Sequence, residues 1–187
     1  MDIVFETQWC VWADCHIAVT PGQVQSKEEF ESSLHLIGSI ENANDLWSWL
    51  QHMPQPSALP VNANIYIMRQ GIMPMWEHEA NVNGGHITLR CDKYNTDHLW
   101  RVLVLMAVGE ELESFLPTAI DDGICGVAVS ARNTSNVLQI WNRQSEKFNA
   151  VAMCKRIQQA ILAAPASNAD LRENTLQKVL ANPIYKS

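Results

Sequence analysis

The chain has few basic residues, no pair of cysteines at metal-ligand spacing and no apolar run long enough to cross a membrane. Of its 187 residues, 13 are Lys or Arg and 20 are Asp or Glu, so the formal net charge is −7. General electrostatic capture of nucleic acid needs a basic face that displaces counterions. The charge balance therefore argues against that mode of binding, but it leaves open a local basic pocket for one nucleotide.

The cysteines number five and contain no CxxC pair. An odd count without that spacing indicates neither a zinc site nor a complete disulfide framework. Free thiols are typical of a reducing compartment. The first residues carry no basic segment of the kind that opens a signal peptide. We therefore expect a soluble, cytoplasmic protein, with the nucleus as a second location, that needs no metal and no cofactor.

The length and an apolar fraction of 47% are sufficient for one sizeable core, which predicts a single domain over residues 1–187. Six segments have the length and the flanking turn residues of strands: 7–12, 32–40, 65–69, 86–91, 124–131 and 137–141. Three have helical character: 42–53, 96–112 and 146–163. We predict an α+β domain, with a mostly antiparallel sheet and helices on one face. The tail after about residue 165 is left open between a short helix and a loop.

The most informative segment runs from Gly71 to Glu79 and reads Gly-Ile-Met-Pro-Met-Trp-Glu-His-Glu. It places the indole of Trp76 directly beside the carboxylate of Glu77. A flat ring stacks on the face of a base, and a carboxylate accepts hydrogen bonds from the donors along one edge of guanine. An alkylated, positively charged guanine gains a cation–π interaction as well. The segment indicates a guanine site, and a loop anchor beside a solvated acid is the alternative.

The first predicted helix has one ring in the wrong place for a core. Its apolar stripe contains Leu46, Trp49, Leu50 and Met53. Trp47 lies roughly 110° from the centre of that stripe. We therefore expect Trp47 to be lateral or exposed, either as a boundary ring that lies flat on its neighbours or as a contact for a partner.

The second predicted helix is apolar on two sides. One stripe contains Leu99, Val102, Leu103 and Met106. The other lies on nearly the opposite face and contains Val104, Leu105 and Val108. A helix laid on a single sheet exposes its back, so the second stripe predicts a partner-binding surface. With Trp47 nearby, it would form a groove suited to an amphipathic helix.

These segments occur in an order and spacing that resembles the cap-binding family of eukaryotic translation initiation factor 4E, from Trp9 to about Pro165. Trp9-Cys10-Val11-Trp12 is similar to the opening strand of the family, and Asp45-Leu46-Trp47 to its first dorsal helix. The segment from Gly71 to Glu77 resembles the central cap-binding motif nearly residue for residue. Cys125 to Arg132, followed by Ile140-Trp141, resembles the phosphate-binding strand and the closing tryptophan.

The resemblance implies a curved sheet whose concave face holds the 7-methylguanosine cap of messenger RNA and whose convex face carries three helices. It implies that Trp76 and Phe30 stack on the methylated base, with His16 as a weaker candidate for the second ring. Glu77 would bind the base edge, and Trp141 would lie against the N7-methyl group. Arg132 would contact the phosphates, and Arg143 could supply a substitute charge.

Two departures from the family pattern bear on the ligand. Phe30 stands where a second stacking tryptophan is usual, and Thr134 and Val137 stand where lysines are common. We therefore expect base recognition to persist, with weaker binding of the triphosphate.

The leading hypothesis is a monomeric cap-binding protein that recruits a scaffold initiation factor, or meets a 4E-binding repressor peptide, through its dorsal helices. The alternative is a cap-poor adaptor of the same fold that mainly binds proteins. An enzyme is disfavoured, because the six histidines show no ligand spacing and no nucleophile motif accompanies them.

Overall fold

The computed structural model describes residues 3–15, 26–113, 123–145, 148–163 and 184–186. His16 and most of the tail after about residue 165 lie outside these residues, so the expectations for them are not tested. None of the helices in the described ranges is long and apolar enough to cross a membrane.

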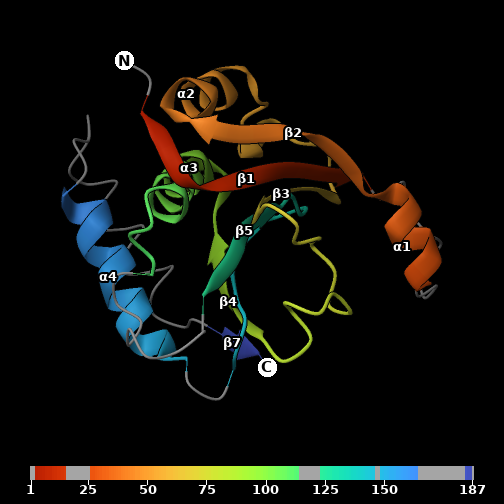
Figure 1. Ribbon diagram of the computed structural model, residues 1–187. Helices are drawn as coiled ribbons and strands as arrows, with labels where there is room; N and C mark the ends of the chain where they lie inside the picture. The colour runs from red at the N-terminus through yellow and green to blue at the C-terminus, as the bar shows by residue number, and fades with distance from the viewer. Residues whose placement is uncertain (1–2, 16–25, 114–122, 146–147, 164–183, 187) are drawn as a thin grey trace.

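A seven-stranded antiparallel sheet forms the centre of the fold, in the order β2-β1-β3-β5-β6-β4-β7. Its strands are β1 (Val4–Cys15), β2 (His35–Asn42), β3 (Ala63–Arg69), β4 (Gly85–Cys91), β5 (Ile124–Ser130), β6 (Asn136–Asn142) and β7 (Ile184–Lys186). The sheet curves strongly, so that it has a concave and a convex side (Figure 1). The predicted α+β class with a mostly antiparallel sheet is confirmed.

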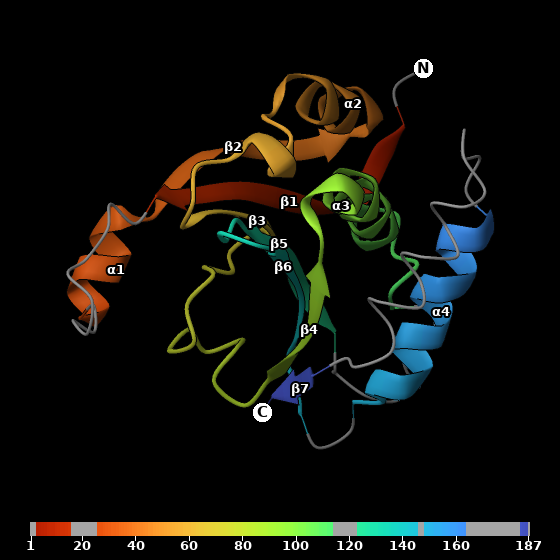
Figure 2. The same ribbon diagram turned by 180° about the vertical axis from the view of Figure 1, so that it is seen from behind.

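Three helices pack on the convex side: α2 (Ala43–His52), α3 (Lys93–Val108) and α4 (Ala150–Ala163) (Figure 2). Alternate residues of the strands point toward them, because successive side chains of a strand face opposite sides of a sheet. Trp9 and Val11 of β1, Ile67 of β3 and Ile140 of β6 are buried in one core with α3. Burial of apolar area at about 25 cal/mol per Å² makes this layer the main source of stability.

Helix α2 begins where the sequence predicts. Asn42 is its N-cap, and the Asn42 side-chain oxygen accepts hydrogen bonds from the backbone N–H groups of Asn44 and Asp45. The indole N–H of Trp49 donates to the carbonyl of Ser39 at 3.0 Å and fastens the helix to β2. Trp47, which lies to the side of the buried stripe, is 49% exposed. The expectation that this ring is not part of the core is confirmed.

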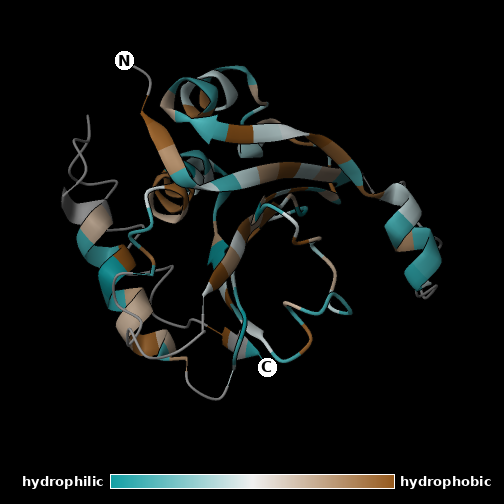
Figure 3. Ribbon diagram, in the orientation of Figure 1, coloured by the Kyte–Doolittle hydropathy of each residue, from teal (hydrophilic) through white to brown (hydrophobic). Residues whose placement is uncertain are grey.

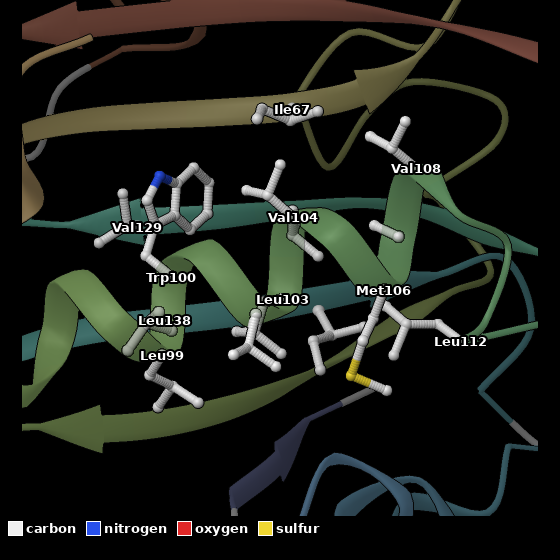
Figure 4. Close-up of a cluster of buried hydrophobic side chains, with 14 of the residues drawn as sticks. Ile67, Leu99, Trp100, Leu103, Val104, Met106, Val108, Leu112, Val129 and Leu138 are labelled. Carbon is white, nitrogen blue, oxygen red and sulfur yellow. The ribbon is translucent and has the colours of Figure 1, made fainter. Parts of the chain in front are cut away.

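Helix α3 begins three residues earlier than predicted, because the Asp92 side chain accepts a hydrogen bond from the N–H of Asn95 and caps the helix at Lys93. Its surroundings also correct one expectation. Val104 and Val108 are buried, at 0% and 1% exposure, so they do not belong to an exposed apolar stripe. The reason is that α3 lies between the sheet, the short 3₁₀ helix η1 (Pro56–Ala58) and α4. Figure 4 shows Val104 pointing from α3 toward Ile67.

A fourth helix, α1 (Lys27–Ser33), was not predicted, and part of it falls within the expected strand 32–40. It lies apart from the other three helices, on the side of the concave face (Figure 1). Its surface is mostly hydrophilic (Figure 3). A capping box starts it: the Ser26 hydroxyl accepts from the N–H of Glu29, and the Glu29 carboxylate accepts from the N–H of Ser26.

Candidate ligand-binding site

A cavity of about 400 Å³ opens on the concave face of the sheet. It is lined by residues of α1, the loop after β3, and strands β3, β5 and β6. Five of the residues that sequence analysis singled out meet there: Phe30, Trp76, Glu77, Arg132 and Trp141. They come from segments far apart in the chain, so the fold gathers them into one site.

The strand registers arrange the floor of the cavity in transverse rows. Trp141 of β6 pairs with Gly126 of β5, which pairs with Met68 of β3. A Cβ atom on Gly126 would come within 2.3 Å of the Met68 sulfur, so the close packing under the tryptophan requires glycine there. This end of the floor is apolar and aromatic.

The floor becomes polar at Val137, which precedes Trp141 by four residues on β6. Val137 pairs with Ser130, and Ser130 pairs with Asn64. Arg132 follows Ser130 just beyond the end of β5. The cavity therefore runs from aromatic rings at one end to hydroxyl, amide and guanidinium groups at the other. A ligand with a flat base and a charged tail matches that gradient.

The loop that carries Trp76 is held by one buried side chain. Asn81, which is 3% exposed, donates hydrogen bonds from its amide nitrogen to the carbonyl of Met73 at 2.9 Å and to the carbonyl of Met75 at 2.7 Å. Gly71 opens the loop with φ of +82°, a backbone conformation that favours glycine. The indole is thus presented by a braced loop. No short-range pattern in the sequence signals the role of Asn81.

The rings of Trp76 and Trp141 are stacked, with centroids 4.0 Å apart and an interplanar angle of 14°. His86 of β4 lies against the same pair, with its ring centroid 4.9 Å from that of Trp76. Trp76 nevertheless remains 45% exposed, so part of its ring is accessible to a ligand.

His86 is a polar group enclosed by this cluster. Its side chain is buried, and its Nδ1 atom has no hydrogen-bond partner among the described residues. Burial lowers the pKa of His86 below its ordinary value, and the nearby Lys186 on β7 lowers it further. A neutral imidazole beside the rings leaves the aromatic end of the cavity without positive charge of its own.

Glu77 is exposed, and its carboxylate forms no hydrogen bond or salt bridge with any described residue. The Arg132 guanidinium is exposed as well and donates to the carbonyl of its neighbour Ala131 at 3.1 Å. Both of these charged groups are therefore accessible to a ligand. A carboxylate and a guanidinium on one cavity suit a ligand that carries a hydrogen-bond donor edge and an anionic group.

A buried polar network supports the floor below them. The Tyr66 hydroxyl donates to the Asp14 carboxylate at 2.9 Å, and the amide of Asn64 donates to the other oxygen of the same carboxylate. Burial, and after it the neighbouring Asp14 charge, raises the pKa of Tyr66 above its ordinary value. The phenol therefore stays protonated and acts as a fixed donor to Asp14.

The residues of the cavity that the sequence analysis missed include Lys27 of α1 and Gln139 of β6. The pattern Ser26-Lys27-Glu28-Glu29 is a capping-box signal that could have revealed α1 and hence the place of Lys27. Gln139 lies on the same face of β6 as Trp141 and accepts a hydrogen bond from its indole N–H at 3.4 Å.

Arg143 is not among the described residues that line the cavity, and its expected role as a phosphate contact stays a prediction. Strand β6 ends at Asn142, and the N–H of Arg143 donates to the carbonyl of Gly123. From Val137 toward Trp141 and beyond, β6 runs away from Arg132. Arg143 therefore lies past the aromatic end of the site, far from its polar end.

The convex side carries a separate set of exposed apolar residues. Trp47 is exposed on α2, Leu105 is half-buried on α3, and Ile3 is exposed beside the first turn of α2, where its carbonyl accepts from the N–H of Ala43. We call Trp47, Leu105 and Ile3 the dorsal surface. Of the four residues expected to contact a partner, Trp47 and Leu105 are accessible, whereas Val104 and Val108 are not.

A larger cavity of about 610 Å³ lies elsewhere and is mostly apolar. Ile37, Trp49, Met53 and Ile65 contribute to its walls. It lacks the pairing of an open ring with a free carboxylate that the concave cavity has, so the chemistry of base recognition points to the smaller one.

The chain is a small α+β protein with a curved antiparallel sheet, helices on the convex side, and a cavity lined by rings and a carboxylate on the concave side. Comparison with known proteins specifies the class. The chain matches the family model for eukaryotic initiation factor 4E over residues 4–177. The chain belongs to the eukaryotic initiation factor 4E family.

The relatives are distant in sequence. The translation initiation factor NCBP of Triticum aestivum is 30% identical over 132 residues, which cover 71% of this chain and 53% of the relative. The NCBP of Oryza sativa subsp. japonica is 29% identical over 164 residues, covering 83% and 69%. The chain thus spans about half the length of the wheat relative.

Two solved structures have the same fold. Caenorhabditis elegans eIF4E-3, in complex with the 4E-binding protein Mextli and a cap analogue, superposes with a TM-score of 0.71 at 24% identity and covers 89% of each chain. Ascaris suum eIF4E-3 in complex with an m2,2,7G cap superposes with a TM-score of 0.67 at 26% identity, covering 87% of this chain and 84% of that one.

Proposed function

We propose that the concave cavity binds the 7-methylguanosine cap at the 5′ end of messenger RNA, within a single cap-binding domain. The observation that carries the proposal is that one cavity holds the exposed ring of Trp76 and the exposed carboxylate of Glu77, which no described residue binds. Family membership supports it, as does the m2,2,7G cap bound by the Ascaris suum relative.

The base would lie between Trp76 and Phe30, which line the same cavity from the loop and from α1. Methylation at N7 makes guanine cationic, so each ring adds cation–π energy of about 0.5–2 kcal/mol to ordinary stacking. Stacking itself contributes about 1–3 kcal/mol per base. Selectivity for the methylated base follows, because guanine without the methyl group lacks the charge.

Glu77 would accept hydrogen bonds from N1–H and from the exocyclic amine of the base. Charge-assisted hydrogen bonds are about twice as strong as neutral ones, and here the acceptor is an anion and the base a cation. Trp141 would reach the N7-methyl group once its stack with Trp76 opens. The phosphates would extend along the floor toward Ser130 and Arg132.

The dorsal surface would hold a helix of a scaffold initiation factor or of a 4E-binding repressor. The Caenorhabditis elegans relative was solved with such a protein, Mextli. Next to Leu105, a groove of about 370 Å³ between α3 and α4 extends the apolar surface through Val102 and Met106. The protein would act as a cytoplasmic monomer that docks capped RNA and performs no bond chemistry.

A cap-poor adaptor of the same fold is the second candidate. The observation that favours it is the contact between Trp76 and Trp141, which closes the space between the two rings. An adaptor would retain partner binding through the dorsal surface while its concave cavity stayed empty.

The test of the proposed function compares two neighbouring acids. Glu77→Gln should reduce the affinity for 7-methyl-GMP by at least about tenfold. The amide keeps one acceptor oxygen but lacks the second one and the negative charge. Glu79→Gln, an exposed acid two residues farther on, is the matched control and should bind as the wild type does. Equal affinities for all three proteins, measured by calorimetry, would refute the assignment of the base edge.

A further inference from the structure

Helix α1 brings a positive charge into the cavity together with a ring. Lys27 and Phe30 are three residues apart, which places them on the same face of a helix, and both line the cavity. The capping box of Ser26 and Glu29 fixes the start of the helix at Lys27. The position of Lys27 on this wall is therefore a consequence of the fold.

A second positive charge lines the cavity from another segment of the chain. Among the described residues that line the cavity, Lys27 and Arg132 supply the cationic groups, and Glu77 is the ionisable acid. Strand β6 contributes Val137 and Gln139, neither of which is charged. The cationic groups thus come from two different segments of the chain, α1 and the residues that follow β5.

Both cations are available. Lys27 is exposed and forms no salt bridge within 4.0 Å of its ammonium to a described residue, and Arg132 bonds only to a neutral carbonyl in the described part of the chain. A lysine ammonium is a compact charge on a flexible stem, and an arginine offers a planar fork. The pair suits a chain of phosphates, which presents several anionic oxygens in succession.

We propose that Lys27 and Arg132, which line the same cavity, together hold the polyphosphate of the cap, so that α1 supplies the charge that β6 does not. The inference rests on the proposed function, since it concerns the phosphates of the same ligand. It assigns Lys27 as a determinant of specificity for a 7-methylguanosine polyphosphate over 7-methylguanosine itself.

The test measures the affinities of the wild type, Lys27→Ala and Arg132→Ala for 7-methyl-GTP and for 7-methylguanosine. Lys27→Ala should weaken binding of 7-methyl-GTP by about two- to fivefold, the range of an exposed ion pair, and leave binding of the nucleoside unchanged. It should also reduce the magnitude of the slope of log affinity against log salt by about 1, the change expected for one lost phosphate contact. Lys27→Arg should restore both.

Two matched variants sharpen the test. Lys155→Ala removes an exposed lysine on α4, on the other side of the sheet, and should change neither affinity. Arg90 of β4 pairs with Val137 and lies on the concave side of the sheet, but it is not among the lining residues of the cavity. A loss of 7-methyl-GTP affinity in Arg90→Ala, with none in Lys27→Ala, would overturn the inference.

The remaining outcomes separate this inference from the proposed function. An equal loss of both ligands in Lys27→Ala would mean that the residue acts through Phe30 or the helix, and would overturn the phosphate role. If the wild type bound neither methylated ligand, the proposed function itself would be wrong. If the wild type bound both methylated ligands and Lys27→Ala had the same affinities, the phosphate role of Lys27 would be wrong and the proposed function would stand.

Discussion

The indole rings of Trp76 and Trp141 lie 4.0 Å apart and nearly parallel, within the cavity where a methylated base would bind. Trp141 cannot lie against the N7-methyl group of a base while Trp76 covers its ring. The contact must therefore open if both tryptophans are to serve the ligand in the way that the family resemblance implies. Opening a pair of stacked rings costs about 0.5–1.5 kcal/mol, which binding energy can supply.

Two stacked indoles should give a coupled signal in the near-ultraviolet circular dichroism spectrum. We expect saturating 7-methyl-GMP to remove that signal, because the rings separate. Trp141→Phe, which lacks one indole, supplies the reference spectrum without coupling. Persistence of the signal in the ligand-bound protein would mean that the base stacks on the outer face of Trp76 and does not touch Trp141.

A second prediction concerns Asn81, whose hydrogen bonds hold the loop that carries Trp76. Asn81→Ala removes both donors to the carbonyls of Met73 and Met75 and should cost about 1–3 kcal/mol of unfolding free energy. The affinity for 7-methyl-GMP should fall as well, although Asn81 does not line the cavity. Chemical denaturation and calorimetry measure the two effects. Asn83→Ala, an exposed position in the same loop, should show neither.

His86 predicts a dependence of stability on pH. Because burial holds its pKa below the ordinary value of 6.5, the folded state binds the proton less well than the unfolded state does. The contribution of His86 to the unfolding free energy is complete above pH 6.5. It is lost as the pH falls from there through the lower pKa of the folded state, because the unfolded state takes up the proton first. As the pH falls through that window, the midpoint temperature of thermal unfolding should decrease less steeply for His86→Gln than for the wild type. Parallel profiles for the two proteins would contradict this.

The dorsal surface can be separated from the cavity by mutation. Trp47→Ala should weaken binding of a 4E-binding helical peptide by roughly 30-fold, or about 2 kcal/mol, the usual effect of truncating an aromatic anchor. Binding of 7-methyl-GMP should stay the same. Val151→Ala, at an exposed apolar position on α4, is the control for peptide binding. The reverse pattern, with cap binding lost and peptide binding kept, would contradict the role of Trp47.

Much of the sheet could be predicted because its strands carry alternation and clear turn residues. The predicted strands 86–91 and 137–141 match β4 and β6 closely, and the predicted helix 42–53 matches α2. The all-round burial of α3 could not be predicted, since it depends on η1 and α4 packing around the helix. Periodicity reports which faces are apolar, but it does not report how many neighbours cover them.

The site shows the same division. The residues Trp76 and Glu77 stand out in the sequence because a ring and a carboxylate are adjacent there. Tertiary structure alone determines three other features of the site: the hydrogen bonds of Asn81, the stacking of Trp76 on Trp141 and the position of Lys27. Helix α1 was missed because its seven residues are too few for a periodic pattern, although its capping box was visible.

The most direct test is a titration of intrinsic tryptophan fluorescence with 7-methyl-GTP, with 7-methyl-GMP and GTP as comparisons. We predict strong quenching by both methylated nucleotides and little by GTP, because stacking on Trp76 and the counter-charge of Glu77 both depend on the cationic base. Quenching by none of the three would contradict cap binding and favour the adaptor. Equal quenching by GTP would show that the cavity does not read the methyl group.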